Sequence, residues 1–164
     1  MLKKITFISI LFFHLTYLNA EVVKEIKISG NQRVSDETVK VYGDIEINKN
    51  YNELDLNKIL KNLNSTNFFE DIKISLEKNI LKVDLIEYPV INQLILIGEP
   101  SKKYSEQIKK LMGLKEKQSF IKSFLSKDIE LIKNLYSAIG YNSSKVEAKI
   151  KNINDRSVEL VIEI

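Results

Sequence analysis

The sequence has no cysteine and no tryptophan, and its one histidine, His14, lies in an apolar stretch near the N-terminus. Without cysteine the chain forms no disulfide and offers no thiolate for zinc binding or nucleophilic attack. If the N-terminal stretch is removed, the remainder also lacks the usual general base and the commonest metal ligand. We therefore expect a protein that is not an enzyme and that holds no metal or cofactor.

Charge of one sign is not concentrated in any segment. The chain carries 25 Lys and Arg against 22 Asp and Glu, a formal net charge of +3. On the expected strands lysine alternates with glutamate, aspartate and serine, which is typical of a solvated face. A nucleic-acid-binding protein would gather its Lys and Arg on one face. We expect neither a nucleic-acid partner nor a small-molecule substrate.

Residues 1–20 have the pattern of a signal peptide. Lys3 and Lys4 form a short positive region, residues 5–15 are mostly apolar, and the segment ends on Ala20. A membrane-spanning helix needs about 20 apolar residues, so removal is favoured over a retained anchor. We expect cleavage between Ala20 and Glu21 and export of the mature chain.

A β-hairpin is the clearest pattern in the chain. Apolar and polar residues alternate on both sides of Lys78-Asn79, which places one set of side chains on a buried face. A short connection containing asparagine, which tolerates positive φ, is typical of a hairpin. A single hairpin is unstable alone and needs helices or further strands over its apolar face. The apolar positions are Ile72, Ile74 and Leu76, then Leu81, Val83 and Leu85.

Two helices are predicted between a first strand at residues 22–29 and the hairpin. Ser35 is a good N-cap followed by acidic residues, and this short helix should end near Gly43. Residues 44–51 are interpreted as a polar connector. A second, amphipathic helix should begin at Asn52, because apolar residues recur at helical spacing after it. They are Leu56, Ile59, Leu60 and Leu63.

The order strand, helix, helix, strand, strand recurs with a period of about 70 residues, which indicates tandem modules. A strand precedes Gly98 as one precedes Gly30, a short helix ends at Gly113, and Gly140 is placed to cap a longer helix. A second hairpin turns around residues 152–155. The apolar positions of the repeat are Tyr104, Ile108 and Leu111, then Leu125, Ile129, Ile132, Tyr136 and Ile139, then Val146, Ala148, Ile150, Val158, Leu160 and Ile162.

The fold class that follows is α+β, with two tandem βααββ modules that each pack a three-stranded mixed sheet on two helices. We expect residues 21–89 to form the first module and residues 90–164 the second, each with its own core. Pro89 fixes its own φ and restricts Tyr88, which should stiffen the joint. Four aromatic residues are assigned to the core rather than to partner contact. They are Phe68, Phe69, Tyr136 and Tyr141.

The arrangement resembles POTRA domains, in particular the first two of the outer-membrane protein assembly factors. The resemblance covers residues 21–164, with the leader before them. Chains of this family normally continue through further POTRA domains into a transmembrane β-barrel, so we expect this sequence to be a fragment or a truncated product. The segments that carry the resemblance are Val22–Ile26, Gly30-Asn-Gln-Arg-Val34, Asn67-Phe-Phe-Glu-Asp71, Ile86-Glu-Tyr-Pro89 and Leu135-Tyr-Ser-Ala-Ile-Gly-Tyr141.

The resemblance implies a role at the periplasmic face of the outer membrane. The partners it implies are unfolded outer-membrane β-barrel precursors, accessory assembly lipoproteins and periplasmic chaperones. Two alternatives stay open, namely another POTRA-bearing translocation, assembly or two-partner secretion protein, and a freestanding periplasmic adaptor.

By the same resemblance, the second strand of each module is an open sheet edge. An open edge can add an extended client strand through main-chain hydrogen bonds. The lysines on these strands can also be interpreted as protection against aggregation, and both interpretations stay open. The implied residues are Asp71, Ile72, Lys73, Ile74, Ser75 and Leu76 in the first module and Lys145, Val146, Glu147, Ala148, Lys149 and Ile150 in the second.

Overall fold

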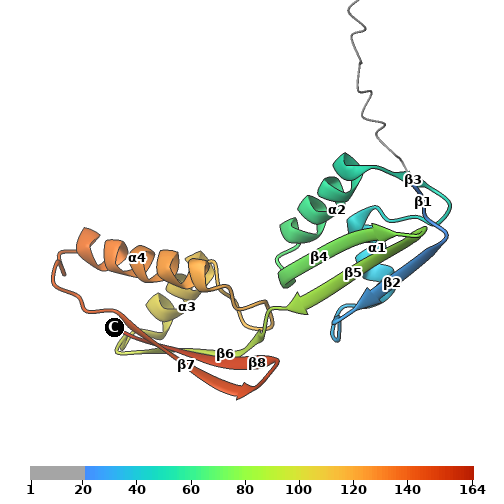
Figure 1. Ribbon diagram of the computed structural model, residues 1–164. Coiled ribbons are helices and arrows are strands. Elements are labelled where there is room, and N and C mark those ends of the chain that lie inside the picture. The colour runs from blue at the N-terminus through green and yellow to red at the C-terminus, as the bar shows by residue number, and fades with distance from the viewer. Residues whose placement is uncertain (1–20) are drawn as a thin grey trace, which may run out of the picture.

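The computed structural model describes residues 21–164, which form two α+β units one after the other (Figure 1). The predicted signal peptide lies outside the described residues. The first unit contains β1 (Glu21–Val22), β2 (Glu25–Ser29), α1 (Asp36–Gly43), β3 (Asn50–Tyr51), α2 (Glu53–Ser65), β4 (Phe69–Glu77) and β5 (Ile80–Glu87). The second contains β6 (Val90–Ile97), α3 (Lys102–Leu111), α4 (Lys122–Ala138), β7 (Glu147–Asn154) and β8 (Ser157–Glu163).

Both units have the same sheet topology. The strand order is β2-β5-β4 in the first sheet and β6-β8-β7 in the second. The last strand of each unit lies in the centre, parallel to the first strand and antiparallel to the second. In each unit two helices cover one face of the sheet (Figure 1). The predicted α+β class, with two three-stranded mixed sheets, is confirmed.

The turn and helix-capping residues predicted from the sequence form the expected local structures. Lys78 and Asn79 have φ of 52° and 65° and join β4 to β5 as the two central residues of a hairpin turn. The side chain of Ser35 accepts a hydrogen bond from the N–H of Thr38 at the start of α1. Asn52 and Asp55 form a capping box at the start of α2, so both orphan backbone donors are satisfied there.

Residues 44–51 are more than the predicted polar connector. Tyr51 is 2% exposed, and β3 pairs with β1, with Val22 opposite Asn50. The predicted first strand is consequently divided at Val23, whose backbone bonds to the backbones of Lys49 and Asn48. The Tyr51 hydroxyl accepts a hydrogen bond from the N–H of Glu46 at 2.7 Å, which lets a tyrosine fill a core position inside a polar segment.

Each unit has its own cluster of buried apolar side chains, as the sequence predicts. Leu63 on α2 and Val83 on β5 belong to the first cluster, and Ile132 on α4 and Leu160 on β8 belong to the second. Phe69 is buried as predicted, but Tyr141 is 64% exposed, so its assignment to the core is wrong.

Three further apolar assignments in the second unit are wrong. Leu111, Ile139 and Ile150 are 59%, 53% and 44% exposed, whereas Met112 and Leu114 are buried. The reason at Leu111 is that α3 ends there and Met112 takes an extended conformation, with φ −59° and ψ 151°, which turns Met112 and Leu114 into the core. Ile139 follows the last turn of α4, and Ile150 lies on an edge strand.

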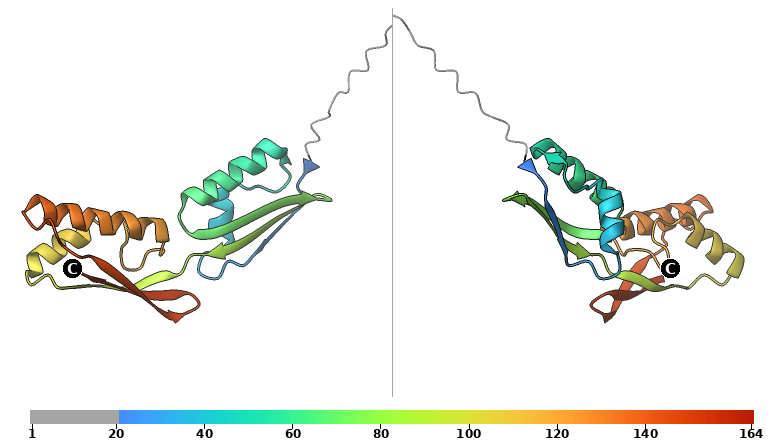
Figure 2. Two further views of the ribbon diagram at one scale, coloured as in Figure 1. Left: turned by 60° about the vertical axis from the view of Figure 1, so that its left-hand side comes forward. Right: turned by 90° about the vertical axis from the view of Figure 1, so that its right-hand side faces the viewer.

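The two units meet at Tyr88 and Pro89, between β5 and β6 (Figure 2). The N–H of Tyr88 donates to the carbonyl of Phe68 at 2.9 Å, on the side of the first unit. The N–H of Phe120 donates to the carbonyl of Pro89 at 2.7 Å, on the side of the second. Tyr88 is therefore hydrogen-bonded to the first unit and Pro89 to the second.

Candidate strand-addition edges

The sequence-implied residues gather on two edge strands. Residues 71–76 all lie within β4, at the edge of the first sheet. In the second sheet residues 147–150 begin β7, while Lys145 and Val146 lie just before that strand. Seven of the eight side chains of β7 are exposed, and only Ala148 is half-buried.

The hairpin turn decides which backbone groups of β4 face outward. In a two-residue hairpin the residues flanking the turn exchange both backbone hydrogen bonds, and bonded and non-bonded pairs then alternate along the ladder. The flanking pair here is Glu77 and Ile80, so Ser75 and Lys73 direct their N–H and C=O toward β5. The outward-facing backbone groups of β4 therefore belong to Ile72, Ile74 and Leu76.

Two independent contacts agree with this direction. The N–H of Ile72 donates to the Oδ1 of Asp71 at 3.0 Å, a side-chain acceptor on its own strand. On the far side of β5, the carbonyl of Asn79 accepts from the N–H groups of Lys24 and Glu25. The backbone N–H and C=O groups of odd-numbered residues in β5 thus point toward β2, and those of even-numbered residues point toward β4.

The same reasoning applies to β7. Arg156 and Ile164 flank β8 on either side. The carbonyl of Arg156 accepts from the N–H of Val90, and the N–H of Ile164 donates to the carbonyl of Ile97, so the backbone groups of even-numbered residues point toward β6. The odd-numbered positions of β8 pair with Glu147, Lys149 and Lys151 of β7. The outward-facing backbone groups along this part of β7 are those of Ala148 and Ile150.

The opposite edge of the second sheet is covered. The loop between α3 and α4 runs along β6, where the N–H of Ile91 donates to the carbonyl of Gln118 at 2.9 Å and the N–H of Lys117 donates to the carbonyl of Ile91 at 2.7 Å. The carboxylate of Glu116 accepts from the N–H of Leu94 at 2.9 Å. This loop leaves β7 as the more accessible edge of that sheet.

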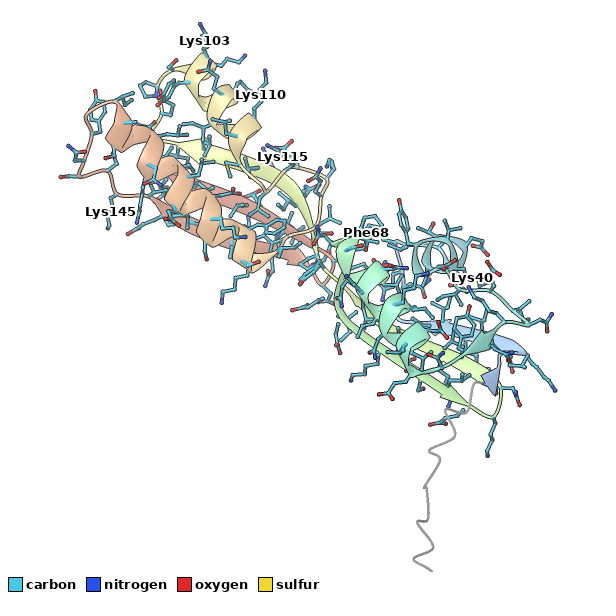
Figure 3. All side chains as sticks on the ribbon, turned by 90° about the horizontal axis from the view of Figure 1, so that it is seen from above. Lys40, Phe68, Lys103, Lys110, Lys115 and Lys145 are labelled. Atoms are coloured by element: carbon cyan, nitrogen blue, oxygen red, sulfur yellow. The ribbon has the colours of Figure 1, made fainter. Side chains whose placement is uncertain are left out.

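The lysines of both edges lie against carboxylates. Lys73 pairs with Asp71 on β4 at 3.7 Å, and Lys149 reaches across to Glu163 on β8 at 2.7 Å. Lys145, labelled in Figure 3, pairs with Glu147 at 2.7 Å. Hydrogen bonding between them raises the pKa of Lys145 and lowers the pKa of Glu147, so both stay charged at neutral pH. These ion pairs lie along a strand or between neighbouring strands, and the Asp71 carboxylate also accepts a hydrogen bond from the outward-facing N–H of Ile72.

Sequence reasoning identified the strands but not the direction of their backbone groups. The register supplies that direction, and it also includes irregularities at Glu70 in β4 and Ile153 in β7 that no residue pattern indicated. Ile150 and Ile153 add two exposed apolar side chains to the β7 edge. Among residues 21–164 no three His, Cys, Asp or Glu side chains gather in a way that could hold a metal ion.

Comparison with known families matches both units. Residues 22–88 match the family described as POTRA domain, FtsQ-type, and residues 89–164 match the POTRA family described as Surface antigen variable number repeat. The outer membrane protein assembly factor BamA of Neorickettsia risticii (strain Illinois) is 25% identical over 154 residues, which are 94% of this chain and 21% of that protein. The chain carries two POTRA domains of the Omp85/BamA family. The resemblance read from the sequence is confirmed, and the family is not enzymatic.

Further relatives show the same extent of similarity. BamA of Neisseria meningitidis serogroup B (strain ATCC BAA-335 / MC58) is 26% identical over 145 residues, 87% of this chain and 18% of that protein. The chain thus spans about a fifth of the length of these two relatives. Within residues 21–164, no helix has the length and apolar character needed to cross a membrane.

Solved structures share the fold of the two POTRA domains. The N-terminal domain of Omp85 from Thermosynechococcus elongatus superposes with a TM-score of 0.57 at 16% identity, over 88% of this chain and 63% of that one. POTRA1-2 of the periplasmic domain of Omp85 from Anabaena superposes with a TM-score of 0.50 at 13% identity, over 88% of this chain and 96% of that one.

Proposed function

We propose that this chain is the periplasmic POTRA region of a BamA-like outer membrane protein assembly factor, and that β4 and β7 bind unfolded β-barrel precursors by strand addition. The observation that carries the proposal is the row of outward-facing backbone groups at Ile72, Ile74 and Leu76 and at Ala148 and Ile150. Accessory lipoproteins and periplasmic chaperones are the further partners that this role requires.

Strand addition suits such clients because its affinity comes from main-chain hydrogen bonds, which every client strand can supply. Outward-facing groups recur at every second residue, about 7 Å apart, which is the spacing of one face of an extended client. The N–H of Ile72 already donates to the Oδ1 of Asp71, so the N–H groups of Ile74 and Leu76 carry the proposal on β4. At the same time, charged side chains beside an edge disfavour permanent pairing with other chains.

Proline at an outward-facing position tests the proposal directly. Ile150→Pro removes an outward N–H at a half-exposed edge residue, so the fold should persist while binding of a peptide from an outer-membrane barrel strand weakens by about tenfold. Ile150→Ala keeps the N–H and removes most of the side chain, and it is the matched control. Binding is measured by fluorescence anisotropy, and folding by circular dichroism.

The first domain offers the same comparison with Ile74→Pro and Ile74→Ala. Proline at Lys73 or Ser75 would instead remove a hydrogen bond to β5 and should destabilise the domain, so it does not test the edge. If folded Ile150→Pro and Ile74→Pro both bind the peptide as tightly as their alanine controls, the edges are not the client sites.

Export to the periplasm has a separate test. We expect the N-terminal sequence of the mature protein to begin at Glu21, the residue with which β1 starts. Edman sequencing or mass spectrometry of the periplasmic fraction measures this. A mature protein that retains residues 1–20 would contradict the prediction.

A further inference from the structure

Two apolar hollows lie along α4 in the second POTRA domain, away from both strand edges, and we treat them as one groove because Leu131 of one hollow and Leu135 of the other are one helical turn apart. One end of the groove is a hollow of about 360 Å³ lined by Tyr104, Leu111 and Leu135, with Gln107, Ile108 and Lys110 beside them. The other is a hollow of about 340 Å³ lined by Phe124 and Leu131, with Gly113, Lys127 and Asp128. Leu111 is 59% exposed, so it lies at the surface of this groove rather than in the core.

The floor of the groove follows one face of α4. Phe124, Leu131 and Leu135 recur at i, i+7 and i+11, and all three are only half-buried. They form a second apolar stripe beside the one that Leu125 and Ile132 bury in the core. Eleven residues of helix extend about 16 Å, or three turns, so the groove can hold three turns of a partner helix.

The charged residues that line the groove are two lysines and one aspartate. Lys110 and Lys127 line it, and neither takes part in any ion pair among residues 21–164. Lys103, Lys110 and Lys115 lie along α3 and the segment after it (Figure 3). Residues 90–164 as a whole carry 13 Lys and Arg against 9 Asp and Glu, whereas residues 21–89 carry 10 against 13.

The one carboxylate in the lining is already occupied. Asp128 is 3% exposed and accepts hydrogen bonds from the N–H groups of Gly113 and Leu114 at 2.6 and 2.9 Å. These bonds hold the turn after α3, and among residues 21–164 Asp128 forms no ion pair with Lys110 or Lys127. The surface is therefore complementary to a partner with an apolar stripe and acidic flanks.

We propose that this groove docks an acidic amphipathic helix of a partner protein. The apolar side chains of the partner helix would contact Leu111, Leu131 and Leu135, and its carboxylates would face Lys110 and Lys127. Helix-in-groove binding uses anchors at i, i+3, i+4 and i+7, which fits a floor made of one helix face. Hollows on both sides of a helix face suit the side chains of a partner helix better than a flat lipid surface. The proposal is independent of strand addition, because the groove shares no residue with β4 or β7.

The test uses two fluorescein-labelled 18-residue amphipathic peptides with the same leucine stripe, one flanked by glutamates and one by lysines. We expect the purified chain to bind the glutamate peptide about tenfold more tightly, with an affinity that falls as salt increases. Lys110→Glu combined with Lys127→Glu should reverse this preference. Leu111→Glu, at an exposed position, should abolish binding of the glutamate peptide with no loss of circular dichroism.

Lys61→Glu combined with Lys133→Glu is the matched control. It makes the same change in net charge at two exposed lysines outside the groove lining, and it should leave peptide preference unchanged. Equal effects of the two double variants would mean general charge attraction and would overturn the proposal. It is also overturned if the glutamate peptide does not bind, or if the chain instead binds vesicles of phosphatidylglycerol and phosphatidylcholine through Lys110 and Lys127.

Discussion

Leu63→Ala is expected to unfold the first POTRA domain selectively, at a cost of about 2–5 kcal/mol in its free energy of unfolding. Leu63 is fully buried on α2, and its cluster includes residues from β4 and β5 but none from beyond β5. A domain of about 70 residues has little reserve stability, so a cavity of this size consumes much of it. The second domain keeps its own core and should remain folded.

Hydrogen exchange followed by mass spectrometry measures this outcome. Protection should fall through residues 21–88 and change much less in residues 90–164. Ile132→Ala, at a fully buried position on α4, is the matched control and should give the opposite distribution. If either variant loses protection uniformly along the chain, the two domains unfold as one cooperative unit.

The parts of the fold that the sequence predicted correctly are those with short-range causes. Asn79 tolerates positive φ in the hairpin turn, Ser35 caps α1, and Asn52 caps α2 together with Asp55 three residues later. In each case the residues that interact lie within one turn of one another. A pattern of neighbouring residues is then sufficient to specify the structure.

The parts that were missed depend on contacts between distant segments. β1 pairs with β3 across almost thirty residues, and Asp128 on α4 holds the turn at Gly113 and Leu114 through two hydrogen bonds. Nothing in the residues around Asp128 distinguishes it from a solvated carboxylate. Met112, and not Leu111, is in the core because α3 ends at Leu111, two residues before the predicted end at Gly113.

The candidate edges also combine features that could be predicted from the sequence with one that could not. The alternation at Ile72, Ile74 and Leu76 predicted a strand with one buried face, and the family resemblance implied that this strand is an edge. Neither one indicates whether those residues or their neighbours direct their N–H groups outward. That direction follows from the pair that closes the hairpin, Glu77 and Ile80, and its consequence is that proline substitutions at Lys73 and Ser75 are unsuitable tests.

Gly30→Ala is expected to destabilise the first domain by about 3 kcal/mol or more, because it combines backbone strain with a collision. Gly30 follows β2 with φ of +80°, a conformation that side chains rarely adopt. A Cβ placed there would lie 1.9 Å from the carbonyl oxygen of Leu85, a backbone atom of the central strand β5. Relief would require β2 to separate from β5, which breaks the parallel pairing at one end of the sheet.

Gly140→Ala separates the two contributions. Gly140 follows the C-cap residue of α4, Ile139, with φ of +98°, and a Cβ there would meet nothing within 4 Å, so only the conformational strain of about 1–2 kcal/mol should appear. Urea denaturation followed by circular dichroism gives both free energies of unfolding. Equal losses in the two variants would mean that β5 yields to the new methyl group at little cost. A larger loss at Gly30 would mean that close packing of the chain against β5, and not φ alone, requires glycine after the first strand.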